Sequence, residues 1–332
     1  MPVTHMRDSI RRILVVSLDN LGDLVFASAL APPLRDAFPD AIIDIWCKDY
    51  TAPIARLVPH VTNVIAADPF WGATPHRGRP PIRPFVKSAA SVRRARYDVA
   101  LLSEAPWRTA AATAAAGIPI RVGLARRHND HFLTNVLPAE DAHKPVVQEQ
   151  ARLLSVFSIQ PRDPRYRLDP APLADARADL ARQIPSFVAL HPFAADARRC
   201  VALTAWIELA RALEARGSSI LWIGTSGELD RLRPLLTSSS HHFIDRVSDG
   251  SLWNTAAALS LATLFVGHDS GPLHLANALG TCVVGVYAPG QPERTFPQGV
   301  APSRMVYSPA PSGITSADML RAIDELPVSS TA

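Results

Sequence analysis

Short apolar runs alternate with amphipathic stretches along most of this chain, and this alternation restricts its fold more than any other sequence feature. In the first part, the apolar runs predict strands at 13–17, 41–46, 64–66, 99–102 and 120–123. In the second part, they predict strands at 187–190, 219–223, 264–266 and 283–286. The stretches between them have helical periodicity. We therefore predict an α/β protein with parallel sheets covered by helices on both faces.

One polar, Pro-rich stretch interrupts this alternation at residues 160–172. A chain of 332 residues is long enough for two domains. We therefore predict two Rossmann-like, doubly wound domains, residues 1–162 and residues 163–332. The last predicted helix, 315–326, belongs to the second domain or packs back on the first. Residues 68–84 are rich in Pro and Arg and predict a loop.

Composition excludes several classes of protein. Hydrophobic residues make up 48% of the chain, which is enough for well-packed cores. No apolar run approaches the length of about 18 residues that predicts a transmembrane helix, and the run at 13–16 is too short for a signal peptide. The three cysteines lie far apart without a C-x-x-C pair, so neither disulfides nor a metal site is expected. We expect a cytoplasmic protein, and no feature indicates its oligomeric state.

The basic residues are concentrated in one segment. The net charge is only +4, but residues 76–127 hold eleven Arg and Lys side chains against two acidic ones, a local balance of +9. Each of these side chains taken singly is best explained as solvated surface. Together they indicate an anionic partner, because the guanidinium fork matches phosphate and carboxylate. No nucleic-acid-binding motif is present, so nucleic acid is not an expected partner.

The first candidate site follows the first predicted strand, where doubly wound sheets bind their ligands. Gly22 allows a substrate to approach the backbone closely, and Asp23 begins a helix at the carboxyl end of the strand. A carboxylate in that position can accept a proton from a hydroxyl group. The alternative is an ordinary acidic residue that stabilises a helix N-terminus. Spacing alone slightly favours this alternative.

The second candidate site follows the strand that ends near residue 266. Asp269, Ser270 and Gly271 stand where a helix begins, and His274 lies in its first turn. Backbone N–H groups and the helix dipole make such a turn suitable for a diphosphate. The alternative is a plain N-cap beside a packed histidine. We favour the anion site, because several polar groups converge on one turn between two apolar stretches.

Two more loops of the second half carry candidate ligand contacts. Arg199 ends the polar stretch 191–199 and is suited to a phosphate, although a solvated surface position is equally compatible with the sequence. Glu228 follows the strand at 219–223 and can accept hydrogen bonds from both hydroxyls of a ribose. Its alternative role is that of an acidic residue at a helix N-terminus.

Taken in order, these motifs resemble those of the ADP-heptose:lipopolysaccharide heptosyltransferases, glycosyltransferase family 9. The stretch 267–289, GHDSGPLHLANALGTCVVGVYAP, is the most specific part of the resemblance. The resemblance implies a GT-B fold, with two Rossmann-like domains facing across a cleft. The first domain would bind the acceptor and the second a nucleotide sugar. It implies inverting sugar transfer from an ADP-sugar, with no obligatory metal or other cofactor.

The resemblance also implies roles for the candidate residues. Asp23 would be the general base, and Arg199 falls where the family commonly has a phosphate-binding lysine. Glu228 would contact the ribose, and residues 248–252 would lie near the adenine. The diphosphate and sugar would contact four residues: Asp269, Ser270, Gly271 and His274. Three arginines of the basic segment are expected to bind an anionic glycan acceptor such as the lipopolysaccharide inner core: Arg121, Arg126 and Arg127.

Such an acceptor would bring the protein into peripheral contact with the inner face of the inner membrane. Departures from the family pattern keep other readings open. Phe193 stands where the family has a glycine and is expected to crowd the nucleotide loop, and Arg199 replaces the lysine. The alternatives are transfer to another acceptor (a secondary metabolite, a capsule or a protein), nucleotide-sugar epimerisation on the same fold, and a non-catalytic sugar-nucleotide-binding relative.

Overall fold

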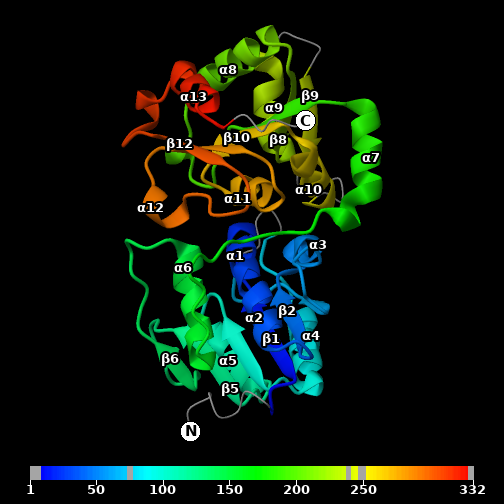
Figure 1. Cartoon of the computed structure of the whole chain (residues 1–332), viewed down its shortest axis with the longest axis vertical. Coiled ribbons are helices and arrows are strands. Elements are labelled where there is room, and N and C mark those ends of the chain that lie inside the picture. Colours follow the sequence, from blue (N-terminus) through cyan, green and yellow to red (C-terminus); the bar gives the residue numbers. More distant parts are fainter. Residues whose placement is uncertain (1–8, 73–77, 237–240, 246–251, 328–332) are drawn as a thin grey trace. The chain divides into compact units, whose positions relative to one another are not determined.

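A computed structural model describes residues 9–72, 78–236, 241–245 and 252–327 of the chain (Figure 1). The chain divides into two compact units, Met1–Leu168 and Asp169–Ala332. The division falls inside the Pro-rich stretch 160–172, where the β–α alternation is interrupted. Each unit has its own hydrophobic core. Among the described residues, no helix combines the length and hydropathy needed to span a membrane.

The first unit contains a six-stranded parallel sheet in the order β3-β2-β1-β4-β5-β6. Its strands are β1 (Arg12–Ser17), β2 (Ile42–Cys47), β3 (Asn63–Ala66), β4 (Val99–Leu102), β5 (Ile120–Leu124) and β6 (Asn135–Leu137). Val15 pairs with Ile45 of β2 on one side and with Leu101 of β4 on the other. The central strands β1 and β4 are mostly apolar because helices cover both faces of the sheet.

The helices of the first unit connect these strands (Figure 1). They are α1 (Leu21–Ala27), α2 (Ala31–Ala37), α3 (Ala52–Ala55), α4 (Ile82–Ala95), α5 (Trp107–Ala115) and α6 (Val146–Ala151). In a parallel β–α unit, each helix starts near the carboxyl end of the strand before it. The N-termini of α1, α4 and α5 therefore belong to the same edge of the sheet.

The second unit repeats this architecture. Its parallel sheet has the order β12-β11-β10-β7-β8-β9. The strands are β7 (Phe187–His191), β8 (Ser219–Gly224), β9 (His241–Asp245), β10 (Leu264–His268), β11 (Val283–Tyr287) and β12 (Ser303–Tyr307). Counted from the first strand of each unit, both sheets have the order 3-2-1-4-5-6. In such a sheet the crevice for a ligand lies between the first and fourth strands, where the direction of winding reverses.

The helices of the second unit are α7 (Ala174–Gln183), α8 (Leu203–Ala215), α9 (Ser226–Leu232), α10 (Leu252–Leu261), α11 (Gly271–Ala278), α12 (Pro292–Thr295) and α13 (Ser316–Asp324). The last helix, α13, packs against α8 and β12 of its own unit. The backbone of β10 is closely surrounded at Gly267. A Cβ atom there would come within 2.6 Å of the Phe265 ring of the same strand and 3.2 Å of the His191 carbonyl oxygen of β7, which favours glycine at this position.

The predicted α/β class and the doubly wound architecture are confirmed, but the predictions of local structure were incomplete. The strands β6, β9 and β12 were missed, and so were the helices α6, α7 and α12; α7 has no fully buried side chain. The loop predicted for 68–84 extends too far, because α4 already begins at Ile82. A proline at position 84 does not prevent this, since the first turn of a helix tolerates proline.

Candidate functional site

Two groups of polar side chains lie at the crevice positions of the two sheets, one group in each unit. In the first unit, β1 and β4 are neighbours and their carboxyl ends carry acidic residues. Asp23 lies in the first turn of α1, after β1, and Glu104 follows β4 by two residues. We call Asp23 and Glu104, with the side chains that contact them, the acidic site.

Asp23 is built into the start of its helix. Its carboxylate accepts a hydrogen bond from the Asn20 backbone N–H at 3.1 Å and completes a capping box. The helix-capping role left open by the sequence is therefore present. The pKa of Asp23 is raised to about 7, chiefly by burial and also by the neighbouring Asp19 charge, while Lys48 acts in the opposite direction. Such a carboxyl group changes its protonation near neutral pH, which suits a general base.

Lys48 reaches the acidic site from the end of β2. It is 4% exposed, and its ammonium donates a hydrogen bond to the Asn20 Oδ1 at 3.2 Å. The Tyr50 hydroxyl accepts a hydrogen bond from the Leu21 backbone N–H at 2.9 Å. These contacts fix the loop between β1 and α1. The half-buried Gly22 is part of the first turn of α1, next to Asp23.

Glu104 is the second carboxyl group of the acidic site, and sequence reasoning missed it. Its pKa is raised to about 7, chiefly by burial and in part by the Asp23 charge, while Arg126 acts in the opposite direction. The two carboxyl groups therefore influence each other's protonation. The Arg126 Nη2 lies 3.0 Å from a Glu104 oxygen and 2.7 Å from a Glu140 oxygen. The only sequence signal for Glu104 was its place directly after a buried strand.

The three arginines expected at the acceptor have different surroundings. Arg126 is held at the acidic site by Glu104 and Glu140. Arg121 instead donates hydrogen bonds to the carbonyl groups of Ile118 and Phe132, and burial lowers its pKa. Its guanidinium thus joins backbone segments near the start of β5. The exposed Arg127 contacts the neighbouring His128 ring nitrogen at 2.9 Å.

In the second unit, the crevice position lies between β7 and β10, and it carries a cationic group. The Arg199 Nη2 lies 2.6 Å from one oxygen of Asp269, and its Nε donates to the Pro289 carbonyl at 3.0 Å. The other Asp269 oxygen lies 3.4 Å from the His274 Nε2. We call Arg199, Asp269 and His274, with the N-terminus of α11, the anion site.

Asp269 orders this network. Burial alone raises the pKa of its carboxyl group, but the hydrogen bonds and charges of His274 and Arg199 outweigh burial and lower it. Asp269 is therefore ionised at neutral pH, and its two oxygens hold Arg199 and His274 in place. Ser270 is the N-cap residue of α11 in an extended conformation, and Gly271 is the first helical residue. The first turn of this helix thus lies beside the Arg199 guanidinium.

His268, which sequence reasoning did not select, fixes the loop that carries Arg199. Its Nε2 accepts a hydrogen bond from the Val201 backbone N–H at 3.1 Å. Because Nε2 is an acceptor, Nδ1 carries the proton and donates to the Val286 carbonyl at 3.2 Å. Burial lowers the pKa of His268 to about 4, so the ring is neutral at pH 7. This ring ties the loop after β7 to β10 and so helps to keep Arg199 near Asp269.

Glu228 occupies the start of α9, after the neighbouring strand β8. Its carboxylate accepts a hydrogen bond from the Thr225 backbone N–H at 2.8 Å, in a capping box. The alternative helix-capping role is thus visible in the geometry, and the ribose contact stays a prediction. The expected adenine contact at 248–252 lies outside the described residues, except for Leu252. Phe193 was expected to crowd the nucleotide loop. Its ring is instead 3% exposed and packs in the hydrophobic core of the second unit.

Among the described residues, no group of three or more His, Cys, Asp or Glu side chains is arranged to hold a metal ion. Two polar groups have the geometry to act on a ligand: the carboxyl pair of the first unit and the Arg199–Asp269–His274 network of the second. The first can move protons near neutral pH, and the second can hold an anion.

Comparison with known proteins relates this geometry to a family. The family model of glycosyltransferase family 9 (heptosyltransferase) matches residues 85–310, more than half of the chain. The chain belongs to glycosyltransferase family 9. This family 9 enzyme is thus a glycosyltransferase, as the sequence predicted. The matched residues include Glu104 and the whole anion site, whereas Asp23 lies before them.

Individual relatives are distant in sequence and close in fold. The family 9 enzyme is 22% identical to lipopolysaccharide heptosyltransferase 2 of Escherichia coli K12, over 86% of this chain and 85% of that protein. The solved structure of E. coli ADP-heptose lps heptosyltransferase II matches with a TM-score of 0.77 at 19% identity, covering 94% of this chain and 97% of that one. An E. coli heptosyltransferase with ADP matches with a TM-score of 0.78 at 18% identity, covering 95% and 99%. These matches confirm the predicted fold.

Proposed function

We propose that this enzyme transfers a heptose, or a closely related sugar, from an ADP-sugar to a hydroxyl group of an anionic glycan of the lipopolysaccharide inner-core type, with inversion. The observation that carries the proposal is the anion site, where Arg199 and the N-terminus of α11 lie within the residues that match the family. The matching structures include a heptosyltransferase with ADP, which supports the choice of nucleotide.

In this proposal the second unit binds the donor. The Arg199 guanidinium and the first turn of α11 stabilise the negative charge that develops on the departing diphosphate. Asp269 acts through its neighbours, since its carboxylate would repel a phosphate while it orients Arg199 and His274. The Glu228 carboxylate accepts hydrogen bonds from the ribose hydroxyls. These residues supply the stabilisation that a metal ion provides in other enzymes.

The first unit binds the acceptor in this proposal. Asp23 removes the proton of the acceptor hydroxyl while the hydroxyl oxygen attacks the anomeric carbon of the sugar and the bond to the diphosphate breaks. Its pKa near 7 leaves a large ionised fraction at cellular pH. Arg126 and Arg127 contribute positive charge toward the anionic glycan. We place the enzyme in the cytoplasm, in peripheral contact with the inner membrane.

Three measurements test this proposal. A thermal-shift series with ADP, UDP and GDP should show the largest stabilisation with ADP, and a preference for UDP or GDP would rule out the ADP-sugar donor. The variant Asp23→Asn should lose sugar transfer by roughly a hundredfold to ten-thousandfold while it keeps its ADP-induced stabilisation. Unchanged turnover in this variant would contradict the role of Asp23. Incubation with the donor alone should leave the sugar nucleotide unaltered, which separates transfer from epimerisation.

A further inference from the structure

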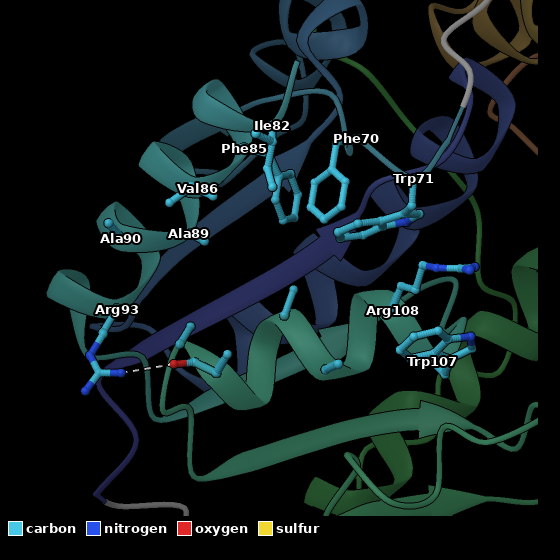
Figure 2. A pocket seen from close by; sticks show the side chains of 14 residues that line it. Phe70, Trp71, Ile82, Phe85, Val86, Ala89, Ala90, Arg93, Trp107 and Arg108 are labelled. Atoms are coloured by element: carbon cyan, nitrogen blue, oxygen red, sulfur yellow. Dashed lines mark hydrogen bonds between the residues drawn. The ribbon is translucent and has the colours of Figure 1, made fainter. Parts of the chain in front are cut away.

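An open apolar groove lies between α4 and α5 of the first unit, apart from the acidic site. Its volume is about 620 Å³ (Figure 2). Aromatic rings line one part of it, and alanines of both helices line the rest. The aromatic side chains are Phe70, Trp71, Phe85 and Trp107. Figure 2 shows Phe70, Phe85 and Trp71 grouped at one side, with Trp107 across from Trp71. A volume of this size is typical of ligand sites.

The groove leaves large apolar side chains in contact with water. Ile82 is 52% exposed, Val86 54% and Trp107 40%. All three lie on the groove, so the exposed apolar surface is continuous with its lining. Contiguous exposed apolar surface of this kind marks an interaction site on a water-soluble unit.

The rim of the groove is cationic. Arg108 and Arg93 are the charged residues that line it, and Arg93 donates a hydrogen bond to the Ala115 carbonyl at 3.1 Å, which links the ends of α4 and α5. Helix α4 has no acidic residue. Its exposed basic residues, together with those just before and after it, are Arg79, Arg83, Lys87, Arg93, Arg94 and Arg96. The complementary partner is therefore apolar in one part and anionic in another.

We propose that this groove and its basic rim dock onto a membrane that contains anionic phospholipids, with one acyl chain in the groove. Apolar and aromatic side chains next to Arg and Lys are the composition of interfacial helices. The fourteen residues of α4 extend about 21 Å, and the hydrocarbon of one leaflet is roughly 15 Å deep, so the groove is long enough for an acyl chain. The arginines match the lipid phosphates.

The position of the groove connects it with the chemistry. The N-termini of α4 and α5 belong to the carboxyl edge of the sheet, where Asp23 also lies. Trp107 and Arg108 mark that end of the groove, and Arg93 marks the other (Figure 2). The inference rests on the proposed function in this respect, because docking here would present a lipid-linked acceptor to the edge that carries Asp23.

Vesicle flotation of the full-length enzyme tests the docking surface. The protein should float with vesicles of phosphatidylcholine and phosphatidylglycerol. It should remain at the bottom of the gradient when the vesicles contain phosphatidylcholine alone. Val86→Asp should weaken flotation at least tenfold, because it places a carboxylate among anionic headgroups. The matched control is Val300→Asp, since Val300 of the second unit is 46% exposed and is not one of the residues that line the groove. This control should float like the unchanged protein.

A second readout distinguishes an inserted acyl chain from electrostatic adsorption. Phosphatidylglycerol brominated in its acyl chains should quench the tryptophan fluorescence, and Trp107→Phe should remove much of that quenching. Lys87→Ala should weaken flotation about fivefold, the effect of one basic residue near an anionic surface. Absence of flotation with anionic vesicles, or flotation without quenching and without a Val86→Asp effect, would overturn the proposal.

A third measurement separates this inference from the proposed function. Val86→Asp should retain the thermal unfolding temperature, the ADP-induced stabilisation and sugar transfer to an acceptor without acyl chains. Normal flotation of the unchanged protein together with absent sugar transfer would count against the proposed function and leave the docking surface standing.

Discussion

The carboxyl group of Asp23 has two roles, because it caps α1 and also titrates near neutral pH. The hydrogen bond from Asn20 stabilises the ionised form, yet burial and Asp19 together keep the pKa near 7. The sequence placed this residue correctly, since an Asp after a buried strand can be recognised. It could not show that the carboxyl group titrates near neutral pH, because the raised pKa depends chiefly on burial in the folded unit.

Replacement of Asp23 by Asn should stabilise the protein at the same time as it removes activity. A pKa raised from 3.8 in the unfolded chain to about 7 in the folded state means that ionisation destabilises the fold progressively as the pH rises between these values. Asn keeps an oxygen for the Asn20 N–H and carries no charge. The unfolding temperature of Asp23→Asn should therefore exceed that of the unchanged protein, and by more at pH 8 than at pH 5. An equal gain at both pH values would contradict this reasoning.

Glu104→Gln should shift the pH dependence of sugar transfer. The transfer rate should rise with pH as Asp23 loses its proton, and the negative charge of Glu104 hinders that loss. Removal of this charge lowers the pKa of Asp23, so the rising part of the kcat/KM profile should move to lower pH. Lys48→Met should move it to higher pH, since Lys48 favours the ionised carboxylate. Profiles that move in the same direction in both variants would rule out this electrostatic coupling.

Among the secondary-structure elements, the sequence predicted the central strands well and the edge strands poorly. Strands β1, β4, β7 and β10 are buried on both faces, so each appears as a continuous apolar run. Strands β6 and β12 lie at sheet edges with exposed residues such as Val136 and Tyr307, and their mixed composition resembles that of loops. The sequence also could not show how Arg121 is used. Its guanidinium donates hydrogen bonds to the Ile118 and Phe132 carbonyls, and these contacts depend on tertiary packing.

Close packing at the end of β5 gives a stability prediction. A Cβ atom on Gly123 would lie 2.8 Å from the Ala105 Cβ and 2.9 Å from the Leu133 Cδ1. Gly123→Ala should therefore reduce the free energy of unfolding by about 1–3 kcal/mol. Gly227→Ala in α9 is the matched control, because no atom lies within 4 Å of its Cβ position. That variant should gain up to about 1 kcal/mol from helix propensity. Denaturant unfolding of both variants measures these effects.

For the whole molecule, the two-unit organisation predicts which unit becomes protected from hydrogen exchange when ADP binds. Each unit has a separate core, and the anion site belongs entirely to the second. Hydrogen exchange measured with and without ADP should show protection in the peptides around Arg199, Glu228 and Ser270. Peptides around Asp23 and Glu104 should exchange as before. Protection centred on the first unit would contradict the assignment of the donor to the second.

Both sheets follow the strand order 3-2-1-4-5-6, so the chain contains the same crevice twice. One copy holds carboxyl groups, and the other holds an arginine beside a helix N-terminus. In the proposed function, the two halves of a displacement reaction, activation of the attacking group and stabilisation of the leaving group, fall to separate copies of one architecture. The enzyme is in this sense modular: a hybrid of two family members joined at Leu168–Asp169 should take its acceptor from one parent and its donor from the other.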